Sequence, residues 1–135
     1  MRKLTLTVTF LSVLVVGAVH YSFAKEKFND GDRSWSRDKV KRYIRRAFAG
    51  RSEKEIKKII AVFDAESGLK CSKISKSNDI GVAQINKIHW KRFGGKDRLK
   101  SCKHNIDSAK IIYKEWGNSL KAWTSYNNGK YKNYL

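Results

Sequence analysis

The chain has 135 residues, with 30 Lys and Arg against 12 Asp and Glu, and therefore a formal net charge of +18. This length allows one ordinary domain. A hydrophobic fraction of 41% supplies enough apolar material for a packed core, which excludes a wholly disordered basic tail. The charge indicates a polyanionic partner: nucleic acid, an anionic membrane or an acidic cell-wall polymer.

Residues 1–24 have the layout of a secretory signal peptide. Arg2 and Lys3 form a basic head, an uncharged stretch rich in Leu and Val follows, and the small residues Ser22 and Ala24 precede the expected cut. We therefore predict cleavage after this segment and a periplasmic or extracellular location. The alternative is an uncleaved N-terminal membrane anchor, because the 21 uncharged residues just reach across a bilayer.

Cleavage would leave 28 basic and 12 acidic residues, a net charge of +16. In an oxidising compartment Cys71 and Cys102 are predicted to form a disulfide, which for a loop of this size stabilises the fold by roughly 3–4 kcal/mol. A metal site is not expected, because His104 alone does not complete a ligand set around Cys71. Residues 25–35 are predicted to be a leader segment, and residues 36–135 the folded domain.

The first half of the domain predicts two amphipathic helices. Ser36 is a suitable N-cap for a helix over 37–49, in which apolar residues recur every three or four positions opposite a row of Lys and Arg. Ser52 and Glu55 form a capping-box pattern at the start of a second helix over 53–66.

The second half predicts more helix and little β structure. Residues 69–79 are a polar loop, 80–86 form a short strand or an extended turn, and 87–93 a helical turn. Two further helices are expected over 105–116 and 119–127, the first ended by Gly117 and the second by Gly129. The fold class is therefore mainly α, an α+β arrangement with at most a small β element.

Glu66 occupies an unusual position for an acidic residue. It lies three residues after Phe63 and seven after Ile59, so a helix places it on the apolar face. It also falls at the helix C-terminus, where the backbone carbonyls disfavour an anion. Both effects favour the protonated carboxyl, which is the form that a general acid needs.

Four short motifs surround this glutamate in the sequence. They are Glu66-Ser67-Gly68, then Asp79-Ile80-Gly81-Val82-Ala83-Gln84-Ile85-Asn86 with His89-Trp90, then Asn105-Ile106, and last Tyr126-Asn127-Asn128-Gly129. In this order they resemble the lysozyme-like superfamily, and more closely the small secreted lytic transglycosylases that accompany bacterial secretion and conjugation systems. The resemblance covers about residues 50–130.

The resemblance implies cleavage of the β-1,4 bond between N-acetylmuramic acid and N-acetylglucosamine in peptidoglycan. It makes Glu66 the catalytic acid, and no cofactor is expected for such a reaction. The substrate-binding residues that it implies are Ser67, Gln84, Asn86, Tyr126 and Asn127. Taken alone, Gln84 and Asn86 are equally suited to turn formation and Tyr126 to core packing.

Asp79 leaves the mechanism open at this stage. Animal-type lysozymes carry their second carboxylate at the matching position, which would make the protein a hydrolase. Only 12 residues separate Glu66 from Asp79, however, fewer than in those lysozymes. This spacing puts an equivalent carboxylate position in doubt. The resemblance to the lytic transglycosylases is what favours Glu66 acting alone, first as acid and then as base, with formation of a 1,6-anhydro end.

Two other classes of function compete with an enzyme. The basic face of the helix over 37–49 suits a non-enzymatic cationic antimicrobial or cell-wall-binding protein, although its apolar face is also needed by the core. Nucleic acid is not an expected partner, because Trp35, Trp90, Trp116 and Trp123 fall mostly at core spacing. We expect a monomer that the net charge holds on anionic cell-wall surfaces, with a secretion or conjugation apparatus as a further partner.

Overall fold

The computed structural model describes residues 30–135, so the predicted signal segment lies outside the described residues. The helices, with η marking short 3₁₀ helices, are η1 (Asp30–Arg33), α1 (Arg37–Ala47), α2 (Glu53–Ser67), η2 (Lys87–His89), η3 (Arg98–Lys100), α3 (Cys102–Glu115), α4 (Thr124–Asn127) and η4 (Lys130–Tyr134). Within the described range, β structure is limited to single antiparallel bridges, Ile74 with Ile80 and Ile80 with Ile85. The predicted helical fold class is confirmed. In this part of the chain no helix is long and apolar enough to cross a membrane.

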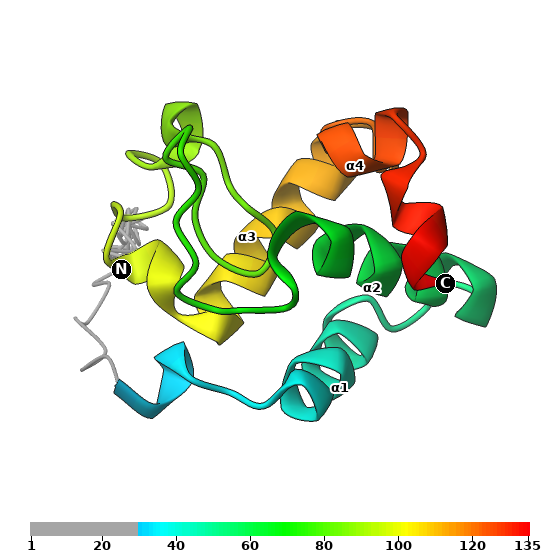
Figure 1. Ribbon diagram of the computed structural model, residues 1–135, viewed down its shortest axis with the longest axis horizontal. Coiled ribbons are helices and arrows are strands. Elements are labelled where there is room, and N and C mark those ends of the chain that lie inside the picture. Colours follow the sequence, from blue (N-terminus) through cyan, green and yellow to red (C-terminus); the bar gives the residue numbers. More distant parts are fainter. Residues whose placement is uncertain (1–29) are drawn as a thin grey trace, which may run out of the picture.

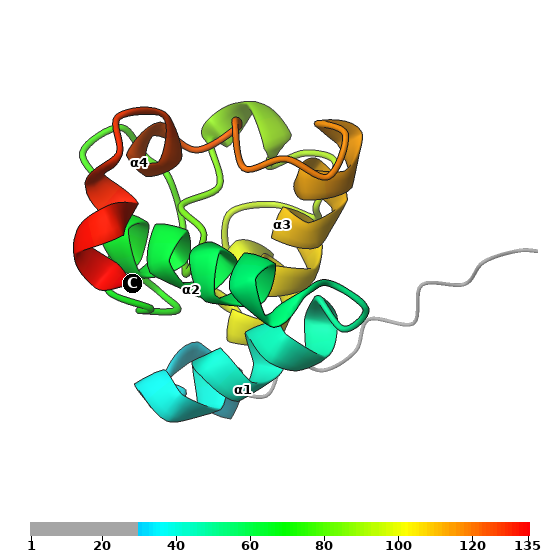
Figure 2. The same ribbon diagram turned by 90° about the vertical axis from the view of Figure 1, so that its right-hand side faces the viewer.

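Helix α2 is the centre of the domain. Figures 1 and 2 show it lying between α1 on one side and α4 on the other. All five residues from 59 to 63 are buried, so α2 is covered on every face through its middle. The Phe63 ring contacts Phe48 and Trp123, with ring centroids 6.3 and 5.4 Å away. The end of α2 is therefore held in a fixed place among the other elements.

Helix α1 packs its apolar stripe into the core as predicted. Val40 and Ile44 are fully buried, whereas Arg42 and Arg45 are exposed. Its N-cap is Ser36, whose Oγ accepts a hydrogen bond from the backbone N–H of Lys39 at 3.3 Å. The helix ends two residues earlier than predicted. This packing uses the apolar face that a membrane-binding function would require.

Both ends of α2 follow local sequence signals. Ser52 Oγ accepts from the Glu55 N–H at 3.2 Å, but only this half of the predicted capping box forms. The Glu55 carboxylate instead pairs with Lys58 at 3.4 Å and accepts from the Tyr113 hydroxyl at 3.4 Å. At the other end Gly68 adopts the left-handed conformation, with φ +66°, that terminates the helix.

Helix α3 begins three residues before the predicted start. Ser101 supplies the N-cap, its Oγ accepting from the His104 N–H at 3.3 Å, a cap that the sequence interpretation missed. Cys102 is the first helical residue and forms the predicted disulfide with Cys71, with the two Cα atoms 4.7 Å apart. The bridge ties the loop after α2 to the start of α3.

The last predicted helix is much shorter in the structure. Only residues 124–127 are helical, because Trp123 has an extended backbone (φ −107°, ψ 129°) and its indole reaches the carbonyl of Ala83. The prediction that Trp116 faces the core is wrong, since 54% of this residue is exposed. Trp116 is the C-cap residue that follows α3, so the helical spacing no longer determines which way its side chain points.

We expect His104 to make the stability of the domain depend on pH. Its Nε2 lies 2.7 Å from the Phe93 carbonyl oxygen. Burial, the largest effect, lowers its pKa below the ordinary 6.5; the hydrogen bond to the Phe93 carbonyl raises the pKa, and the charge of Arg98 lowers it further. The unfolded chain therefore binds this proton more readily, and stability is lost as the pH falls below 6.5 toward the folded value. We expect a lower melting temperature at pH 5 than at pH 7, and a smaller difference in His104→Gln. An unchanged difference in the variant would contradict this assignment.

Candidate active site

Glu66 lies at the penultimate position of α2 and is partly exposed. Its Oε1 accepts a hydrogen bond of 2.9 Å from the backbone N–H of Ser125, in α4. The carboxyl group borders a cavity of about 170 Å³ that is lined by Ala65, Glu66, Thr124, Ser125, Asn128 and Lys130. The end of α2 and the segment from α4 to η4 thus form the walls of one site.

The two acidic residues near the end of α2, Asp64 and Glu66, have different hydrogen-bond and ion-pair partners. Asp64 is 7% exposed and receives both Nη atoms of Arg37, at 3.0 and 2.6 Å. This hydrogen bonding raises the pKa of Arg37. Glu66 has no such ion pair with any residue from 30 to 135, although the Lys73 ammonium donates to its backbone carbonyl at 3.0 Å. The Glu66 carboxyl therefore remains open toward the cavity.

The turn over residues 80–85 is fastened to the end of α2 and to the start of α4. The buried Ser67 hydroxyl lies 2.6 Å from the Val82 carbonyl oxygen. The Trp123 indole N–H donates to the Ala83 carbonyl at 2.8 Å. These bonds hold the turn beside the helix that carries Glu66.

Asn105 fastens the same turn to α3. It is fully buried, its Oδ1 accepts from the Ala83 N–H at 2.9 Å, and its Nδ2 donates to the carbonyls of Ile80 and Leu99, each at 2.8 Å. A Cβ on Gly81, where φ is +81°, would collide with the Asn105 amide. The Asn-Ile motif is therefore a positioning element, a role that the sequence alone did not assign.

Three of the residues expected to bind substrate make contacts inside the protein. Ser67 is 2% exposed and bonds to backbone, so in this structure its hydroxyl does not face solvent. Gln84 has φ +48° and its amide donates to the carbonyls of Lys73 and Gly81. Asn86 is exposed and its Oδ1 caps η2 by accepting from the Ile88 N–H. The turn chemistry considered for Gln84 and Asn86 is present.

The other two predicted binding residues lie in α4. Tyr126 is half-buried and stacks on Tyr131, with ring centroids 5.4 Å apart, while Asn127 is exposed and donates to the Lys121 carbonyl. Neither lines the Glu66 cavity. The lining residues that the sequence interpretation missed are Thr124, Ser125, Asn128 and Lys130. Of these four residues, Asn128 could most readily have been predicted from the sequence, because it lies inside the Tyr-Asn-Asn-Gly motif.

The Asp79 carboxylate is hydrogen-bonded to nearby residues of the chain. Its carboxylate accepts hydrogen bonds from the Ser77 hydroxyl at 2.6 Å, the Asn86 amide at 2.8 Å and the Ser75 hydroxyl at 3.4 Å. It does not line the cavity beside Glu66. The two carboxylates that could share the chemistry therefore have very different surroundings.

In the described residues the domain is helical, and Glu66 lies between its central helix α2 and the segment from α4 to η4. The model of the transglycosylase SLT domain, a member of the lysozyme-like superfamily, matches residues 43–134, the greater part of the chain, and the chain therefore belongs to this family. Comparison with curated proteins and with solved structures gave no match. The family comprises lytic transglycosylases, so the protein is an enzyme and peptidoglycan is its substrate.

Proposed function

We propose that this enzyme cleaves the β-1,4 bond between N-acetylmuramic acid and N-acetylglucosamine with Glu66 as its only catalytic carboxyl, and that it leaves 1,6-anhydro ends. One observation carries the proposal: the Ser125 N–H fixes the Glu66 carboxyl beside a cavity, whereas Asp79 is outside that cavity with its carboxylate already hydrogen-bonded.

The proposed reaction uses Glu66 twice. As an acid it donates its proton to the glycosidic oxygen while the bond from that oxygen to the anomeric carbon breaks. The resulting carboxylate then takes the proton of the 6-hydroxyl of the same muramic acid, whose oxygen bonds to the anomeric carbon. Proton and charge balance without consumption of water, and Glu66 ends in its starting form.

The surroundings of Glu66 support this double role. The Ser125 N–H donates a hydrogen bond to Oε1 of Glu66, and no residue from 30 to 135 donates a hydrogen bond to its Oε2. One oxygen is therefore held in place while the other is free to carry the proton. The cationic Lys130 in the cavity wall compensates the charge of the carboxylate that exists between the two steps.

The chemical nature of the products tests the proposed reaction. We expect purified sacculi digested with the enzyme to release muropeptides that carry 1,6-anhydro-muramic acid, because the internal hydroxyl replaces water as nucleophile. Mass spectrometry separates the two outcomes, since a hydrolysed end is heavier by one water. Products with ordinary reducing ends and no anhydro species would overturn the proposal and favour a hydrolytic lysozyme.

Replacing Asp79 separates the single-carboxyl route from a route with two carboxylates. We expect Asp79→Asn to keep cleavage within about tenfold of the wild type, because a second catalytic carboxylate would be worth roughly 10²–10⁴-fold. Initial rates on sacculi should be measured together with melting temperature, since Asp79 also orders its loop. Asp97→Asn, which removes an exposed carboxylate paired with Lys100, is the matched control.

We also propose that the protein is exported and acts in the periplasm or outside the cell. The layout of residues 1–24 and the resemblance to enzymes of secretion and conjugation systems support this location and a partner in such an apparatus. The mass of the protein recovered after export measures cleavage directly. Recovery of the full-length chain in the membrane fraction would instead support an N-terminal anchor.

A further inference from the structure

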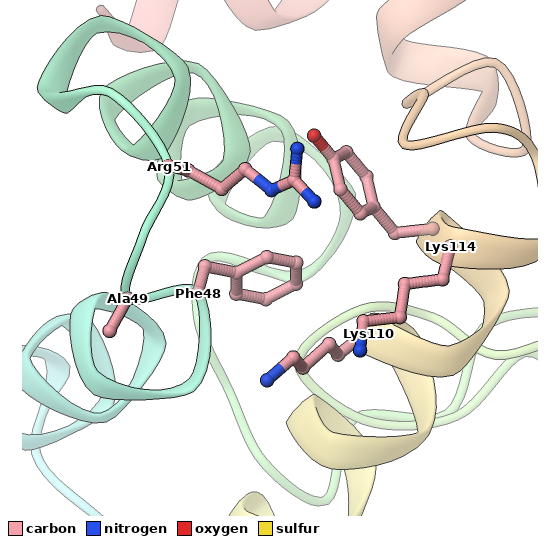
Figure 3. Close-up of a pocket in the computed structure, with 6 residues that line it drawn as sticks. Phe48, Ala49, Arg51, Lys110 and Lys114 are labelled. Carbon is pink, nitrogen blue, oxygen red and sulfur yellow. The ribbon is translucent and has the colours of Figure 1, made fainter.

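A second cavity lies at the other end of α2, away from Glu66. It has a volume of about 150 Å³ and is lined by Phe48, Ala49, Arg51, Lys110, Tyr113 and Lys114. Figure 3 shows the lining side chains around this space, which come from the end of α1, from the connection between α1 and α2 that carries Arg51, and from the last turns of α3. Three of the six lining residues are cationic and none is acidic.

The charges in this cavity are not neutralised by the protein. Lys110 and Lys114 form no ion pair with any residue in the described part of the chain. Arg51 donates one hydrogen bond, of 2.7 Å, to the neutral amide oxygen of Asn118. The lining contacts one carboxylate, Glu55 on the Tyr113 hydroxyl, and Lys58 already pairs with it.

Two positive charges four residues apart destabilise helix α3. Lys110 and Lys114 are four residues apart on α3, so their ammonium groups share one face and repel each other. The approach of Arg51 from the connection between α1 and α2 adds a third charge to the same small volume. A bound anion would relieve this repulsion, and the cavity is far larger than the ~15 Å³ that a single water requires.

The cavity floor is ordered by aromatic packing. The rings of Phe48 and Tyr113 meet edge to face with centroids 5.5 Å apart. The Arg51 guanidinium carbon lies 5.6 Å from the centroid of the Tyr113 ring, a cation–π contact that restricts its orientation. A guanidinium held in this way loses little entropy when it binds an oxyanion through two N–H groups.

We propose that this cavity is a binding site for a phosphate group. Phosphate presents acceptor oxygens in a tetrahedral arrangement, so the guanidinium fork and the two ammonium groups can approach it from different directions, whereas a carboxylate presents only two oxygens in one plane. Glu66 and Arg51 are separated by the length of α2, about 20 Å, so the phosphate site is separate from the cavity of Glu66. The enzyme thus carries a second contact, directed at the phosphate groups of a polymer or lipid near its glycan substrate.

Titration with inorganic phosphate, followed by NMR against chloride at equal ionic strength, tests this site. We expect saturable shifts of the backbone amides over residues 48–51 and 110–114, and at least tenfold weaker binding in Lys110→Gln/Lys114→Gln. Lys54→Gln/Lys57→Gln removes the same two charges from exposed positions on α2 and should bind within twofold of the wild type. Equal loss in both double variants, or shifts spread over the whole basic surface, would overturn the proposal.

Two further probes distinguish the sources of the phosphate. Binding to phosphatidylglycerol vesicles that depends on Lys110 and Lys114 identifies a lipid headgroup, while the same dependence with a soluble glycerol phosphate oligomer identifies a polymer. Dependence in neither would contradict the site. No glycan is present in these measurements, so their result is independent of the role proposed for Glu66.

Discussion

Replacing Glu66 by Gln is expected to lower the rate of sacculus cleavage by roughly 10³-fold, the range typical for loss of a general acid–base group. The glutamine amide has nearly the shape of the carboxyl, and its oxygen can still accept the hydrogen bond from the Ser125 N–H. Its N–H groups can donate hydrogen bonds, but they are not acidic enough to transfer a proton to a glycosidic oxygen. The initial rate of muropeptide release and the melting temperature are the measurements.

The matched control for this substitution lies on the same helix. Glu53→Gln alters the first residue of α2, where an exposed carboxylate pairs with Arg45. It makes the same chemical change about 20 Å from the cavity, and we expect it to keep activity within twofold. Unimpaired lysis by Glu66→Gln would show that positive charge alone disrupts the wall, as in the cationic antimicrobial alternative.

Replacing Asn105 by Ala is expected to destabilise the domain by roughly 3–5 kcal/mol, because three buried backbone groups lose their partner at about 1–3 kcal/mol each. The groups are the Ala83 N–H and the carbonyls of Ile80 and Leu99. Such a loss is a large part of the total stability of a small domain. Urea unfolding at neutral pH measures the free energy directly.

The same substitution should also reduce activity, although Asn105 does not line the cavity of Glu66. It holds the turn over residues 80–85 against α3, so cleavage should fall even at temperatures where the variant remains folded. Ile111→Ala, at a position on α3 that is 46% exposed, is the control and should cost about 0.5 kcal/mol or less. A loss below about 1 kcal/mol in Asn105→Ala would show that water replaces the amide.

Local signals in the sequence were sufficient to place the starts of the first two helices and the glycine that ends α2. The starts of α1 and α2 coincide with the predicted ones, because Ser36 and Ser52 cap their own third following residues, and Gly68 ends α2 through its own backbone freedom. These are interactions between neighbours in the chain. The disulfide was also predictable, since Cys71 and Cys102 are the two cysteines of the sequence.

The errors occurred where distant contacts override local preference. The helical pattern over 119–127 was real, but Trp123 leaves the helical conformation and its indole bonds to Ala83, forty residues earlier. Asn105 could be recognised as part of a motif. Its role, however, is to hydrogen-bond the backbone of the turn over residues 80–85, which lies next to it only in the folded protein. No periodicity in the sequence encodes either contact.

The sequence by itself determined the helical class, the disulfide and the choice of Glu66 as the acid to consider, because an acid on an apolar stripe at a helix end is visible in the spacing. The tertiary structure decided which groups surround that acid. It brought Ser125 and Lys130 to Glu66, kept Asp79 within its own loop and gathered Arg51 with Lys110 and Lys114. The physical reason is that helix-forming interactions act over four residues, whereas a site joins side chains that only the packing of helices brings together.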